Sequence, residues 1–178
     1  MIERAAAGIV DRHGRDAITG ADILITHTQL PDLPFCGGGG AMAHRLGMKP
    51  DRVLDLHNGG CAAFVLALDV ARILIGSGAG RSAVIAIAAN AAGRIFDQPT
   101  VRRKAQAAVP GDGAAVAVVA ASDRAPILDV ECRTYGEYAG DMTVESDPPR
   151  EWWQPGPGEG YIGFTEHKIA KVLARGNR

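Results

Sequence analysis

The sequence predicts an α/β protein built on a layered sheet. Short apolar runs of strand length alternate along the chain with segments whose apolar residues recur at helical spacing. Hydrophobic residues make up 47% of the 178 residues and charged residues 22%, which is a globular composition and not a disordered one. A chain of this length suits a single domain with a sizeable core, which we place over residues 1–178.

The first half of the chain carries alternating helical and strand signals. Ile23, Leu24 and Ile25 form a short apolar run bounded by polar residues, and Gly47 ends a short helical segment. Four glycines at 37–40 lack the flanking residues of a phosphate loop, so we expect them to allow a close backbone approach. The expected elements are a helix at 2–10, a polar turn at 11–16, a strand at 23–25, a loop at 31–40, a helix at 41–46 and a strand at 52–56.

The second half begins with a change to helical spacing after Cys61. Phe64, Leu68 and Ala71 recur on one helical face, and a continuous apolar run at 82–88 is typical of a strand buried on both faces. The expected elements are a helix from Cys61 to about Gly76, a strand at 82–88, an irregular excursion at 91–110, strands at 114–121 and 127–132, a loop at 141–160 and a final helix at 165–174.

Charge and composition narrow the function classes. The formal net charge of −1 gives no electrostatic reason to expect nucleic acid or an anionic membrane as a partner. No apolar run has the length of a membrane span, and residues 1–5 lack the layout of a signal peptide, so a cytoplasmic location is expected. Cys36, Cys61 and Cys132 are odd in number and widely spaced, which favours neither disulfides nor a metal site.

The most informative chemistry lies in the run DLHNGGC at residues 55–61. A strand ends, two glycines make a turn, and Cys61 opens an apolar helix that we expect to be buried. A helix N-terminus stabilises a thiolate, and free backbone N–H groups there donate to an oxyanion when a thioester is attacked. The alternative is a cysteine that serves as a small hydrophobic residue.

Several motifs in order resemble the β-ketoacyl-acyl-carrier-protein synthase III family of the thiolase superfamily. The helix that opens with CAAF at 61–64 is similar to the family's nucleophile helix, and PGDGAA at 110–115 is similar to its GDGA segment at a similar spacing. LG at 46–47 ahead of the strand-forming residues 53–55 fits as well. The resemblance covers about residues 22–122.

This resemblance implies a thiolase-like α/β/α fold with a mixed sheet of the five-stranded type. The chain would carry one half of the usual two-half fold, the N-terminal one, without its first strand. Its core is expected over about 22–136, with 137–178 forming a loop and helix that lead to a C-terminal half. In the family that half supplies a catalytic His with an Asn or a second His. The chain ends at Arg178, which leaves open a truncated sequence, a split enzyme or an inactive remnant.

The resemblance also implies an acyltransferase or condensing-enzyme subunit for fatty-acid, polyketide or related secondary-metabolite biosynthesis. An acyl group would pass from acyl-CoA, or from the phosphopantetheine of an acyl carrier protein, to Cys61, whose backbone N–H would be an oxyanion donor. No permanently bound cofactor is implied. The partner would be a second copy, or a chain that supplies the C-terminal half, with residues 82–88 at or beside the shared sheet.

Further site residues follow from the resemblance. Phe35 stands where the family places a phenylalanine that reaches into the partner's acyl pocket. Gly111, Asp112 and Gly113 would be architectural, close to the nucleophile helix. Arg102 and Arg103 would contact coenzyme A or a carrier protein, although a solvated basic loop is an equal alternative. Between Asp55 and Cys61 the chain has one residue more than the common family pattern.

Local residues that could assist Cys61 are few. His57 and Asn58 lie beside it in sequence, where Asn58 could equally organise the turn. His27 ends the first strand and could approach the site, but a surface or structural role is the better interpretation. We expect Cys36 to pack locally and Cys132 to lie in the core.

Two other function classes stay open from the sequence. A non-catalytic scaffold subunit of a split or degenerate ketosynthase would keep the fold and shape another chain's pocket. A thiolase-like degradative enzyme would need a further cysteine, which should lie in the C-terminal half.

Overall fold

The computed structural model describes residues 1–31, 36–57, 59–90, 92, 103, 105–108 and 110–138. The chain divides into two compact units, Met1–Gly136 and Glu137–Arg178, and the fold below is that of the first. The loop predicted at 141–160, with its two tryptophans, and the final helix predicted at 165–174 lie outside the described residues.

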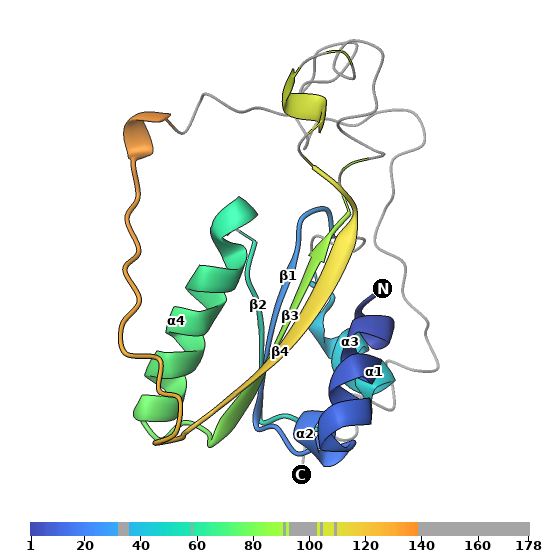
Figure 1. Cartoon of the computed structure of the whole chain (residues 1–178), viewed down its shortest axis with the longest axis vertical. Coiled ribbons are helices and arrows are strands. Elements are labelled where there is room, and N and C mark those ends of the chain that lie inside the picture. The colour runs from blue at the N-terminus through green and yellow to red at the C-terminus, as the bar shows by residue number, and fades with distance from the viewer. Residues whose placement is uncertain are drawn as a thin grey trace. The chain divides into compact units, whose positions relative to one another are not determined.

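A mixed four-stranded sheet organises the first unit (Figure 1). Its strands are β1 (Ile23–Thr28), β2 (Arg52–Asp55), β3 (Ser82–Ala89) and β4 (Gly113–Ala120), in the order β2-β1-β3-β4. β1 is parallel to both β2 and β3, whereas β4 runs antiparallel to β3. Four strands in this arrangement agree with a sheet of the five-stranded type without its first strand.

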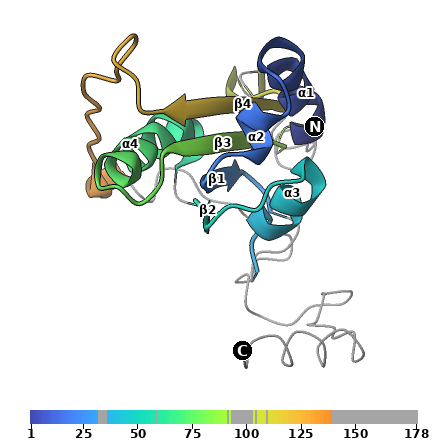
Figure 2. The ribbon, with the colours of Figure 1, turned by 90° about the horizontal axis from the view of Figure 1, so that it is seen from below.

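Helices lie on both faces of this sheet, as the view from below shows (Figure 2). α4 (Ala63–Gly76) covers one face, while α1 (Ile2–His13), α2 (Asp16–Thr19) and α3 (Gly39–Leu46) lie on the other. Short 3₁₀ turns occur at Gly60–Ala62, Ala105–Ala108 and Gly136–Tyr138. Within the described part of the chain, no helix has the length and apolar character needed to cross a membrane.

Each face of the sheet builds its own apolar core. Successive residues of a strand point to opposite faces, so Leu24 packs with α1 and α3, whereas Ile23 and Ile25 pack toward α4. α4 meets them with Ala67 and Ala71, which are fully buried and spaced one helical turn apart. Because these side chains are small, the backbone of α4 lies close against the sheet.

The observed elements correct several boundaries. β1 continues to Thr28, three residues beyond the predicted strand, and α3 begins two residues earlier than predicted, at Gly39. α1 continues to His13, where Gly14 with φ 83° ends it, and α2 occupies part of the predicted turn. The core therefore begins before residue 22, since Ile2 and Ile18 are buried. The α-helix after Cys61 starts two residues later than predicted, at Ala63.

The strand predicted at 127–132 is wrong. These residues are irregular in the structure, and Leu128 is 87% exposed. Alternating apolar residues form a strand only when a neighbouring edge and a core are available to them. For the same reason Cys132 is exposed, and the prediction that it lies in the core is wrong.

β3 is buried on both faces, as predicted for 82–88. It also pairs with β1 over residues 83–88 on one side and with β4 along its whole length on the other. Both sets of backbone hydrogen bonds are thus occupied, and β3 cannot itself form the edge of a sheet shared with a partner. Among the described strands, the edges are β2 and β4.

The amino end of the sheet is fixed by Asp22. Its carboxylate accepts a hydrogen bond from the Arg81 backbone N–H at 2.6 Å, which joins the start of β1 to the loop before β3. This backbone donor, with the Arg81 guanidinium nearby, holds the pKa of the Asp22 carboxyl below its usual range.

Enlarging a buried alanine of α4 should destabilise the protein. Ala67 lies between α4 and the sheet with no exposed surface, so Ala67→Leu should lower the free energy of unfolding by about 1–3 kcal/mol. Ala41→Leu makes the same exchange at an exposed position of α3 and should change it by less than about 0.5 kcal/mol. Urea denaturation measures both, and equal effects would contradict the close packing of α4.

Candidate functional site

Cys61 lies at the carboxyl end of the sheet, between β2 and α4. The chain leaves β2 at Asp55 and enters the 3₁₀ turn Gly60–Ala62, which runs directly into α4. The thiol of Cys61 is exposed. It precedes the first residue of a 14-residue helix by two positions, so it lies at the positive end of the helix dipole. The predicted order of strand, Gly-Gly turn, cysteine and helix is observed.

The two glycines of this turn are needed for different reasons. A Cβ atom at Gly59 would lie 2.5 Å from the Cα and 2.7 Å from the Cβ of Ala63, so a larger residue would collide with the first turn of α4. Gly60 has open space around it but a φ of 47°, a conformation that other residues adopt at a cost. The Ala62 N–H closes the turn on the Gly59 carbonyl at 2.9 Å.

The helix that follows Cys61 is covered on one face. Ala63, Ala67 and Ala71 face the sheet, whereas Phe64, Val65 and Ile73 are between 42% and 55% exposed. Within the first unit, α4 is therefore buried on one face only, and the prediction of a buried helix is wrong. A single sheet covers only one side of a helix.

A carboxylate ties the ends of β1 and β2 to α3. The Thr26 hydroxyl donates to Asp55 Oδ1, and the Gly39 N–H donates to Asp55 Oδ1 at 2.9 Å and Oδ2 at 3.2 Å. Gly39 is the first residue of α3, so the Asp55 charge also lies at the positive end of that helix. This cluster was not predicted from the sequence, although polar residues near the ends of neighbouring parallel strands are the signal that indicates it.

The contacts of Asp55 explain why glycines stand at and before the start of α3. A Cβ at Gly39 would lie 2.5 Å from Val53 Cγ1 and 2.9 Å from Asp55 Oδ2. Gly37 has a φ of 68°, and a Cβ there would overlap the Asp55 carboxylate. The predicted close backbone approach at a helix start is confirmed.

The histidines divide between the core and the surface. His27 is 4% exposed, and its Nδ1 lies 2.7 Å from the Leu56 carbonyl oxygen. The interpretation of His27 as a surface residue is thus wrong, whereas a structural role fits. His57 is exposed. Within the described ranges, no histidine forms a hydrogen bond with Cys61.

The GDG segment lies at the same end of the sheet as the Cys61 turn, but at its opposite edge. Gly113 begins β4 and pairs with Ala89, the last residue of β3. Asp112 Oδ1 accepts the Ala92 N–H at 3.0 Å, which anchors the chain where it leaves β3. β2 and β4 are the two edges of the sheet, and three strand spacings of about 4.8 Å separate them. An architectural role for Gly111, Asp112 and Gly113 stays a prediction.

Several predicted site residues are not located by the structure. Phe35, Asn58 and Arg102 lie outside the described residues. Arg103 is exposed in a turn. Cys36 is exposed, so the prediction that it packs locally is wrong.

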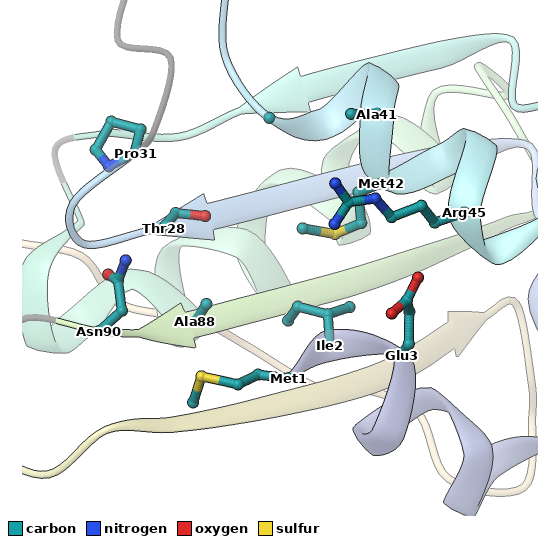
Figure 3. Close-up of a pocket in the computed structure, with 11 residues that line it drawn as sticks. Met1, Ile2, Glu3, Thr28, Pro31, Ala41, Met42, Arg45, Ala88 and Asn90 are labelled. Atoms are coloured by element: carbon teal, nitrogen blue, oxygen red, sulfur yellow. The ribbon is translucent and has the colours of Figure 1, made fainter.

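A cavity of about 380 Å³ lies on the opposite face of the sheet from α4 (Figure 3). Glu3 of α1 and Arg45 of α3 stand at one end of it, and Thr28 and Asn90 at the other. The Asn90 side chain also bonds both backbone groups of Leu30, at 2.9 and 3.0 Å, which joins the segments after β1 and β3. In the described part of the chain, no three His, Cys, Asp or Glu side chains are grouped to hold a metal ion.

Comparison with known proteins supports the resemblance. Residues 54–136 match the model of the 3-oxoacyl-[acyl-carrier-protein (ACP)] synthase III family. Over 144 residues the chain is 33% identical to a β-ketoacyl-[acyl-carrier-protein] synthase III from Gloeobacter violaceus, an alignment that covers 81% of this chain and 42% of that protein.

Solved structures give the same result for the fold. The β-ketoacyl-[acyl-carrier-protein] synthase III from Thermus thermophilus superposes with a TM-score of 0.58 and 29% identity, over 67% of this chain and 35% of its own. A tetronic acid condensing enzyme superposes with a TM-score of 0.56 and 25% identity, over 70% of this chain and 37% of its own. The chain spans about two fifths of the length of the relatives it matches.

Neutralising the Asp55 carboxylate should weaken the carboxyl end of the sheet. Asp55→Asn replaces one acceptor oxygen with an NH₂ group, and we expect the free energy of unfolding to fall by about 1–2 kcal/mol. Asp51→Asn, at an exposed position just before β2, is the matched control and should change it by less than about 0.5 kcal/mol. Denaturant titration measures both variants, and similar values would show that the Asp55 hydrogen bonds contribute little.

The steric demand at Gly59 can be separated from general effects of glycine replacement. Gly59→Ala should lower the free energy of unfolding by about 1–3 kcal/mol, because Ala63 must move. Gly8→Ala, inside α1 with no atom within 4 Å of the added Cβ, should raise it by about 0.5–1 kcal/mol. Thermal or urea unfolding measures both variants. The proposed contact would be contradicted if both substitutions changed the free energy of unfolding in the same direction.

Proposed function

Because the chain is β-ketoacyl synthase III-like in sequence and in fold, we propose that it is an acyl-accepting part of a condensing enzyme with Cys61 as nucleophile. The acyl donor is acyl-CoA or the phosphopantetheine of an acyl carrier protein. The observation that carries the proposal is the exposed Cys61 thiol, which a Gly-Gly turn presents at the start of α4.

The first chemical step is transfer of the acyl group between two sulfur atoms. The Cys61 thiolate attacks the thioester carbonyl carbon, its new C–S bond forms, and the bond to the donor sulfur breaks. The donor leaves as a thiolate and takes up the proton that Cys61 lost. The dipole of α4 stabilises the negative charge on Cys61, and the backbone N–H of Cys61 donates to the oxyanion.

Arrival of the donor can be assisted by the basic segment before β4. Arg103 is exposed, and with Arg102 it would offer guanidinium groups to the phosphates of coenzyme A or to an acidic carrier protein. Residues 110–112 lead into β4 at the same end of the sheet as Cys61. These contacts belong to the proposal.

The second step, delivery of the acyl group to a carbon, oxygen or nitrogen nucleophile, calls for a further polypeptide half. The exposed apolar side chains Phe64, Val65 and Ile73 give α4 a second face that such a half would cover. We propose that this half, supplied by a different chain, brings the histidine that would assist the transfer. The products would be fatty-acid, polyketide or related biosynthetic intermediates.

A scaffold role is the second candidate. It is favoured by one observation, that within the described residues Cys61 has no hydrogen-bonded histidine. A scaffold subunit would keep the sheet and α4 to shape the pocket of a catalytic chain without accepting an acyl group itself.

Incubation with acetyl-CoA distinguishes the two candidates. The enzyme proposal expects one acyl group per chain by intact-protein mass spectrometry, located on the peptide that contains Cys61 and absent from Cys61→Ser. Cys36→Ser and Cys132→Ser remove the other two exposed thiols and should leave the adduct in place. No adduct on Cys61, with or without a complementary half, would favour the scaffold.

A further inference from the structure

His27 occupies a face of β1 that is otherwise aliphatic. Along this strand Ile23 and Ile25 pack toward α4, and His27 follows with the same spacing of two residues, so it lies on the α4 side of the sheet. On α4, the buried residues Ala71, Ala67 and Ala63 step toward the same end of the sheet. His27 is therefore placed under the N-terminal turn of α4, to which Cys61 leads.

The buried imidazole of His27 has a defined partner. Its Nδ1 lies 2.7 Å from the Leu56 carbonyl oxygen. A carbonyl oxygen only accepts hydrogen bonds, so Nδ1 must carry the proton in this contact. Burying a polar ring in an apolar layer is costly unless it is hydrogen-bonded, and this contact provides the compensation.

Leu56 is held on both of its backbone groups by consecutive residues of β1. Its N–H donates to the Thr26 carbonyl at 2.8 Å, and its carbonyl accepts from His27. Leu56 directly follows the last residue of β2 and is the point from which the chain turns toward Cys61. The direction in which the turn leaves the sheet depends on this carbonyl.

We propose that His27 is a positioning residue for Cys61. Its Nδ1–H fixes the Leu56 carbonyl, from which the chain leaves β2, and thereby the place of the Cys61 thiol at the N-terminal end of α4. An aliphatic side chain in the same position would fill the space but leave the strand exit without this hydrogen bond. The catalytic value of this position rests on the proposed function. The position of the thiol itself can be tested without that function.

Alkylation by iodoacetamide, resolved for each cysteine by peptide mass spectrometry, tests the inference without any acyl donor. His27→Leu should slow alkylation of Cys61 about three- to tenfold, as expected for loss of one hydrogen bond that holds the reactive geometry. Cys36 and Cys132 are exposed internal controls whose rates should not change. His44→Leu, at an exposed position of α3, is the control for the exchange itself.

Two amide variants decide the result even if His27→Leu does not fold. An asparagine amide reaches about as far as Nδ1, so His27→Asn should keep the Cys61 rate within about twofold, whereas the glutamine of His27→Gln places its amide further out and should not. An unchanged Cys61 rate in His27→Leu, or equal rates in His27→Asn and His27→Gln, would overturn the inference. If these rates behave as expected but acetyl-CoA gives no adduct, the positioning role stands and the proposed function fails.

Discussion

The Asp55 carboxylate is the interaction on which the arrangement of the site depends. It accepts hydrogen bonds from the Thr26 side chain and the Gly39 backbone, so one side chain joins β1, β2 and the start of α3. Thr26 lies within β1 and Asp55 is the last residue of β2, so this side-chain contact adds to the backbone hydrogen bonds that pair the two strands. The requirement for glycine at positions 37 and 39 follows directly, because the backbone must approach the carboxylate closely.

The chain is anchored both where it leaves β2 and where it enters α4. Leu56 is bonded through both backbone groups to β1, and Gly59 packs against Ala63 with no room for a side chain. Exposed segments usually vary in position, but here both ends of the turn are anchored to buried elements. Such anchors favour a fixed position for the exposed Cys61 thiol, which the proposed acyl-accepting role would require.

The two faces of α4 explain why the first unit carries the Cys61 site but does not enclose it. The face with small residues packs on the sheet, and the face with Phe64, Val65 and Ile73 is exposed in the described unit. The relatives have chains more than twice as long as the part matched here. An acyl chain attached to Cys61 would require apolar walls, which a second half packed on α4 would complete.

The sequence by itself determined the fold class, the strands from 23 to 121 and the Gly-Gly-Cys turn, because apolar periodicity and glycine punctuation are local signals. It did not determine the structure of residues 127–132. They have the apolar pattern of a strand but are irregular, because they pair with no strand and pack on no core. Nor did it indicate that His27 is buried or that Asp55 joins three elements. Those facts depend on which strands become neighbours, and the contacts that decide this lie about 30 residues apart along the chain, as with Thr26 and Asp55.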